Sequence, residues 1–68
     1  MTYQAGHIKH NADTLDVAVR TSFPEDDERL AQMAWVVAGP NSRTRHASTD
    51  KVADWADLYI PPAAESAP

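Results

Sequence analysis

The clearest pattern in the sequence is a two-residue alternation of apolar and polar side chains over residues 15–23. A strand with this pattern has an apolar side with Leu15, Val17, Val19 and Phe23 and a polar side with Asp16, Arg20 and Ser22. Turn-forming residues occupy positions 11–14, and residues 6–10 can pair back with Ile8 facing inward. The pattern predicts a β-hairpin over residues 6–22 whose apolar side faces the core.

Residues 24–38 fit two structures. The capping-box spacing of Ser22 and Glu25, and the stop signal Gly39 before Pro40, favour a helix. The apolar run over residues 33–38 favours a strand with Trp35 on its inner face. We favour a loop or short acidic helical turn over residues 24–30, followed by a central strand over residues 32–38.

The second half of the chain predicts an edge strand and a helix. Residues 43–48 are polar throughout and follow a Gly-Pro-Asn-Ser turn, which is typical of an edge strand. Over residues 50–58, apolar side chains recur at helical spacing, and Trp55 and Tyr59 share one face that could serve as a dimer interface. Pro61 and Pro62 end this helix, so we expect a domain over residues 1–60 and a disordered tail over residues 61–68.

The predicted fold class is α+β: a small β-rich domain of two antiparallel hairpins, residues 6–22 and 32–48, with one C-terminal helix. An open barrel of the SH3 type is one arrangement that fits. The predicted core consists of Ile8, Leu15, Val17, Val19, Phe23, Leu30, Met33, Trp35, Val37, Val52, Trp55 and Leu58.

Composition narrows the class of protein further. The chain has 68 residues, so its core is expected to be small. It has no cysteine, so no disulfide can stabilise the fold, and a cytoplasmic setting fits. Ten acidic and six basic residues give a net charge of −4, which weighs against general nucleic-acid binding. The longest apolar run, residues 33–38, is too short to cross a membrane.

Two charged segments are candidate partner-binding sites. The basic one is Arg43, Arg45 and His46, joined across the sheet by Arg20 or Lys9, and it could recognise phosphate or an acidic protein surface. A solvated edge strand is the competing interpretation. The acidic one spans residues 25–28, with Glu25, Asp26 and Asp27 as the candidate binding residues; a solvated loop is its competing interpretation.

The sequence contains no motif that is typical of an enzyme active site or a metal-binding site. His7 and His10 are three positions apart, and a strand would turn them to opposite faces, away from a shared ligand. The sequence has no nucleophile elbow, phosphate-binding loop or dinucleotide fingerprint, and only two glycines. We therefore expect no enzyme activity, no cofactor and no metal.

Several segments together resemble small uncharacterised proteins of bacteriophages that infect high-GC actinobacteria. They are Tyr3, Gly6 and Ile8, then residues 17–21, 34–37, 45–48 and 52–55, so the resemblance covers most of residues 3–59. It implies a cytoplasmic accessory protein that engages a host factor. We thus expect a protein-binding module that modulates a host or cellular complex. A nucleic-acid-binding module using Arg43 and Arg45, or a structural subunit that oligomerises, are the alternatives.

Overall fold

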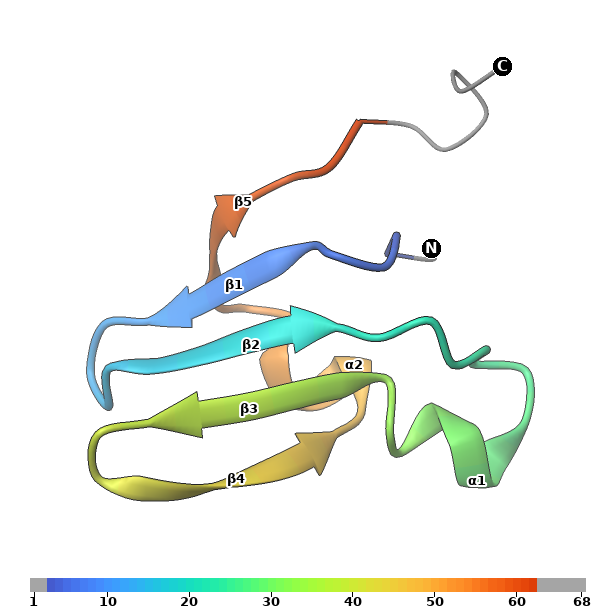
Figure 1. Cartoon of the computed structure of the whole chain (residues 1–68), viewed down its shortest axis with the longest axis horizontal. Helices are drawn as coiled ribbons and strands as arrows, with labels where there is room; N and C mark the ends of the chain where they lie inside the picture. The colour runs from blue at the N-terminus through green and yellow to red at the C-terminus, as the bar shows by residue number, and fades with distance from the viewer. Residues whose placement is uncertain (1–2, 63–68) are drawn as a thin grey trace.

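A computed structural model of the protein describes residues 3–62 and forms one five-stranded antiparallel sheet (Figure 1). The elements in chain order are β1 (Ile8–Asn11), β2 (Asp16–Arg20), α1 (Glu28–Ala31), β3 (Trp35–Gly39), β4 (Ser42–Ala47), α2 (Thr49–Val52) and β5 (Ala56–Tyr59). The strand order is β4-β3-β2-β1-β5, which confirms both predicted hairpins. It also makes β2 the central strand of the sheet.

The turn between β1 and β2 is built by local hydrogen bonds. The Asn11 Oδ1 accepts the backbone N–H groups of Asp13 at 2.9 Å and Thr14 at 3.3 Å. Leu15 then takes a left-handed conformation with φ of 64°, and its N–H donates to the Asn11 carbonyl at 2.8 Å. An asparagine side chain that closes a turn on its own backbone explains why this cluster forms a hairpin.

The sheet buries the side of β2 that the sequence pattern assigned to solvent. Asp16, Ala18 and Arg20 are buried, whereas Val17 is half-buried and Val19 is 38% exposed. The prediction that the apolar side of this strand faces the core is therefore wrong. The reason is tertiary: α2 and the segments around it pack on the polar side, behind the sheet in Figure 1.

The core is small and centres on Trp35. It consists of Ala18, Ala34, Trp35, Val37 and Val52, with Tyr3, Ala47 and Trp55 packed against it. The Trp35 indole N–H donates to Thr49 Oγ1 at 2.9 Å, which fastens α2 to the sheet. Three predicted core residues are thus confirmed as fully buried: Trp35, Val37 and Val52.

The other predicted core residues lie nearer the surface. Those that are half-buried are Ile8, Val17, Leu30, Met33 and Trp55. Those that are exposed are Leu15, Val19, Phe23 and Leu58. Two alanines, two valines and one tryptophan form the buried core in their place, and charged side chains are buried on the same side of the sheet.

The predicted helix over residues 50–58 is also wrong beyond its first turn. Ser48 occupies the N-cap position of α2 without a side-chain capping hydrogen bond, and α2 ends at Val52. The strand β5 follows and pairs with β1. Pairing with β5 satisfies the backbone groups on the outer side of β1, and Asp57 reaches the buried Lys9 from this strand. This long-range gain outweighs the helical spacing of the apolar residues.

The remaining segments agree in part with the favoured interpretation. A single helical turn, α1, precedes the strand β3, as expected, but β3 lies between β4 and β2 and is not the central strand that the sequence predicted. Pro61 and Pro62 lie outside helices and strands, and residues 63–68 of the predicted tail lie outside the described residues. Among residues 3–62 no helix has the length and apolar character needed to cross a membrane.

Gly39→Ala is expected to destabilise the protein by about 1–3 kcal/mol, because a Cβ at this position would overpack its surroundings. That atom would lie 1.9 Å from Asp16 Oδ1 and 3.1 Å from Asp16 Cα. Urea denaturation measures the change. Gly6→Ala is the comparison variant. It introduces backbone strain, because Gly6 has φ of 93°, but no steric overlap, because no atom lies within 4 Å of its Cβ position. Equal stability of Gly39→Ala and wild type would contradict this packing.

Leu15→Asn is expected to stabilise the protein by about 0.5–1 kcal/mol, because asparagine tolerates the left-handed conformation better than leucine does. The 54% exposure of the Leu15 side chain means that little packing is lost. Thermal unfolding measures the effect, with Leu15→Ala as the control that removes the side chain but keeps the backbone strain. Asparagine no more stable than alanine would be the contrary result.

Candidate functional site

Lys9 is a structural residue of the covered face and not a surface cation. Its side chain is 4% exposed, and its Nζ lies 3.1 Å from Asp57 Oδ1. The ammonium also donates to the Trp55 carbonyl at 3.1 Å and to the Ala53 carbonyl at 3.4 Å, and it lies 5.1 Å from the centre of the Tyr3 ring. Lys9 thus ties the exit of α2 and the strand β5 to β1.

Arg20 is buried in the same way, two residues along β2 from Ala18, which pairs with Lys9. Its guanidinium donates to Glu25 Oε2 at 3.2 Å, to the Ala34 carbonyl at 3.2 Å and to the Thr21 carbonyl. Glu25 also accepts the Thr49 hydroxyl, so α2 joins the network. Because both Arg20 and Lys9 are enclosed, neither can add to a cation patch at the surface.

Arg45 is partly engaged by Asp16. Its Nη2 lies 3.3 Å from Asp16 Oδ2, and its Nη1 donates to Ser42 Oγ at 3.0 Å. Asp16 also accepts the hydroxyls of Ser42 and Thr14, each at 2.9 Å. These two hydrogen bonds, helped by Arg45, lower the pKa of Asp16 below its usual value.

The basic residues singled out from the sequence do not share one surface. Arg43 is exposed on β4. Arg45 lies opposite Val37 and so belongs to the covered side, whereas His46 lies opposite Val36 on the other side of the sheet. The exposed part of the predicted basic patch is therefore Arg43 and half of Arg45.

The acidic run over residues 25–28 is likewise divided. Glu25 is half-buried beside Arg20. Asp27 caps α1, where it accepts two backbone N–H groups at 2.9 and 3.3 Å. Asp26 and Glu28 point to solvent as exposed side chains. Two of the four acidic residues, Glu25 and Asp27, therefore have a structural role.

The histidines lie on different sides of the sheet. His7 is buried, and its Nε2 is 2.7 Å from Asp57 Oδ1; its ring meets Tyr3 and Trp35 edge to face, with ring centres 4.9 and 5.8 Å away. His10 pairs with Val17 on the opposite side. Within residues 3–62, no three histidine, aspartate or glutamate side chains gather as metal ligands.

The side of the sheet opposite Lys9 and Arg20 is the surface that stands out, and we call it the open face. Strand pairing arranges it in two rows that cross the sheet. The first row, from β5 to β4, is Tyr59, Ile8, Val19, Val36 and His46. The second row, from β5 to β3, is Ala56, His10, Val17 and Ala38.

The open face contains no aspartate, glutamate, lysine or arginine. Five charged residues of the paired strands project to the covered face: Lys9, Asp16, Arg20, Arg45 and Asp57. Arg43, which is exposed, lies at the register shift of β4 and belongs to neither row. Figure 1 shows α2 behind the sheet, and no helix or strand of residues 3–62 lies over the face turned to the viewer. The neutral side of the sheet is thus the uncovered one within the described chain.

This arrangement is the reverse of what an isolated domain favours. Burial of a lysine or arginine carries a desolvation cost, while a valine or isoleucine left partly exposed forgoes part of its transfer free energy. A contiguous apolar surface of this kind marks an interaction site in soluble proteins. The open face is therefore the candidate functional site, and sequence analysis missed it because it assigned the same valines to the core.

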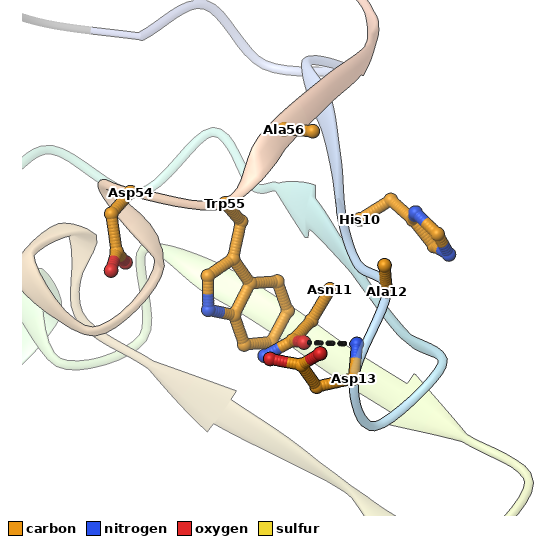
Figure 2. Close-up of a pocket in the computed structure, with 7 residues that line it drawn as sticks. All are labelled: His10, Asn11, Ala12, Asp13, Asp54, Trp55 and Ala56. Carbon is orange, nitrogen blue, oxygen red and sulfur yellow. Dashed lines mark hydrogen bonds between the residues drawn. The ribbon is translucent and has the colours of Figure 1, made fainter.

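A shallow pocket beside Trp55 is a separate, concave feature, with a volume of about 280 Å³ (Figure 2). Its lining consists of His10, Asn11, Ala12, Asp13, Asp54, Trp55 and Ala56. Figure 2 shows Asp54 on one side of the indole, Asn11 and Asp13 on the other, and the His10 ring directed away. The Asn11 side chain already closes the turn between β1 and β2, so its position in the pocket has a structural reason.

Comparison with known proteins returns no match to a protein-family model, to a curated protein or to a solved structure. The functional argument therefore depends on the geometry of the chain itself.

Asp57→Asn is expected to destabilise the protein at neutral pH, with a deficit that disappears as the pH falls. Hydrogen bonds from His7 and then Lys9 lower the pKa of Asp57 below its ordinary value of 3.8. A carboxylate with a depressed pKa stabilises the fold above pH 3.8, and that contribution is lost as the pH falls through the folded-state pKa.

Chemical denaturation of wild type and Asp57→Asn from pH 7 to well below pH 3.8 measures this linkage. The exposed Asp26→Asn is the matched control, since it removes the same charge from a side chain outside the network. A difference between wild type and Asp57→Asn that stays constant over this pH range would contradict the ion-pair assignment.

Proposed function

We propose that this protein is a non-enzymatic protein-binding module that works through the open face. The observation that carries the proposal is the neutrality of that face: nine side chains in two rows, with aliphatic residues at the centre and no charged group among them. Burial of such a surface by another protein would recover the hydrophobic free energy that the described chain leaves unused.

The shape and chemistry of the open face favour a macromolecule over a small ligand. Small-molecule sites are concave and enclose most of their ligand, whereas this surface is one side of an open sheet. A nucleic acid would need cations for its phosphates, and the open face has none. Arg43 and the half-exposed Arg45 remain the basis of the nucleic-acid alternative, which Asp16 weakens by its ion pair with Arg45.

We also propose that the sheet is a partly open barrel of the SH3 type. The strand order places β1 between β2 and β5, and α2 lies between β4 and β5 in the chain. A short meander whose first strand also pairs with the last strand supports this assignment. Because such small barrels carry many unrelated functions, the barrel itself adds no argument for a particular partner.

The resemblance to actinobacteriophage proteins suggests where a foreign partner would come from. A phage-encoded accessory protein in the cytoplasm would meet host proteins, so a host complex is the proposed target.

A photoreactive amino acid placed at residue 19 is expected to form a covalent adduct with a protein partner in an extract of the cells that express this chain. Val19 is the centre of the first row and 38% exposed, so the probe replaces it without disturbing the core. Mass spectrometry of the adducts identifies the partner.

The matched control carries the same probe at residue 23, because the Phe23 side chain has the same 38% exposure but lies outside the strands. Adducts formed only from residue 19 support the proposal. Failure of residue 19 to form any protein adduct, including one with its own chain, would overturn it.

A further inference from the structure

We propose that the occupant of the open face is a second copy of this chain, docked sheet to sheet about a two-fold axis that runs along β2. This inference rests on the proposed function, since it names the partner of the same surface. It makes the protein a two-layer β-sandwich in its dimeric form, with both charged faces on the outside of the pair.

The first row of the open face is symmetric in the way that such a dimer requires. From β5 to β4 its side chains are an aromatic ring, three aliphatic groups and a second ring: Tyr59, Ile8, Val19, Val36 and His46. A two-fold axis along β2 lays each strand of one copy over the strand equally far from β2 in the other. Val19 then faces the partner's Val19, Ile8 faces the partner's Val36, and Tyr59 faces the partner's His46.

The second row is complementary under the same operation. Val17 lies on β2 and faces its own copy across the axis. His10 on β1 faces the partner's Ala38 on β3, so that the larger side chain meets the smaller one. Alternation of large and small residues across two sheets allows their side chains to interdigitate.

Charge provides the argument for self-association over a foreign partner. Two copies of a chain with a net charge of −4 repel each other, so a stable homodimer needs an interface without carboxylates. The open face meets this condition. Foreign partners are usually selected by complementary charges, and this face offers none to select with.

The number of residues in the open face determines the dimer affinity that we expect. Standard interfaces use about 20–30 residues on each side, and the open face contributes fewer than half of that number. We therefore expect a reversible dimer with a Kd on the order of tens of micromolar. Such a dimer would form at high local concentration and dissociate on dilution.

Edge pairing through β5 is the competing mode of self-association. Leu58 is 61% exposed and lies at the register shift of β5, and Ile60, just beyond this strand, is 63% exposed. A second copy that extended the sheet would add its β5 to this edge and leave Val19 uncovered. One substitution in each place separates the two modes.

Sedimentation equilibrium tests the proposal over about 1 μM to 1 mM protein, a range on both sides of the expected Kd. We expect the wild-type mass to rise from 7.5 kDa towards twice that value. Val19→Asp should have a Kd raised at least tenfold, so that its mass stays below that of wild type across the range, because two carboxylates would meet at the axis. Leu58→Asp adds the same charge at the β5 edge and should dimerise like wild type.

A charge-swap experiment tests the axis itself. Val19→Asp mixed with Val19→Lys should give a heterodimer, although each variant alone dimerises more weakly than wild type, because residue 19 faces residue 19. Far-UV circular dichroism of each variant verifies that the monomer is folded. A misfolded Val19→Asp is replaced by Val36→Asp mixed with Ile8→Lys, the other facing pair.

Each outcome has a distinct meaning. Dimerisation lost in Leu58→Asp and kept in Val19→Asp would replace the face-to-face dimer with edge pairing. A wild type that stays monomeric to 1 mM would overturn self-association. If the photoreactive residue 19 then captured a different protein, the binding function of the open face would still stand; if it captured nothing, both proposals would fall.

Discussion

The structure depends on the burial of charged side chains between the sheet and α2. Lys9 and Arg20 are each 4% exposed, and each is held by a carboxylate and by backbone carbonyl groups. These contacts join segments that are far apart in the chain: β1 to β5, and the end of β2 to α2 through Glu25. A buried ion pair is retained only where its hydrogen bonds compensate for lost hydration, so this face is specified by geometry more than by hydrophobicity.

The apolar character of the open face follows directly from the burial of charged side chains on the other side of the sheet. Side chains alternate along a strand, so a sheet that turns Lys9, Asp16 and Arg20 inward must turn Ile8, Val17 and Val19 outward. The core consists of two alanines, two valines and one tryptophan, and the aliphatic groups that would enlarge it lie on the other side of the sheet. The uncovered valines are thus a consequence of the same pattern that buries the charges.

The two proposals use this division in different ways. The binding function needs only that the open face is apolar and accessible. The homodimer needs more: the rows must repeat their chemistry on both sides of β2, and they must exclude carboxylates in a chain of net charge −4. In such a dimer the charged network becomes the outer layer and the valines become the true centre, which would restore the usual order of a protein interior.

The sequence by itself determined the local structure. The turn at Asn11, the alternation around Val17, the short helical turn before Trp35 and the polar edge strand were all readable, because each depends on neighbours in the chain. Only the tertiary structure decided which side of the hairpin is covered, since period-two alternation defines two faces but not which one receives α2. The same holds for β5: helical spacing around Trp55 is a local signal, and it loses to pairing with β1 and to the contact of Asp57 with Lys9, more than forty residues away.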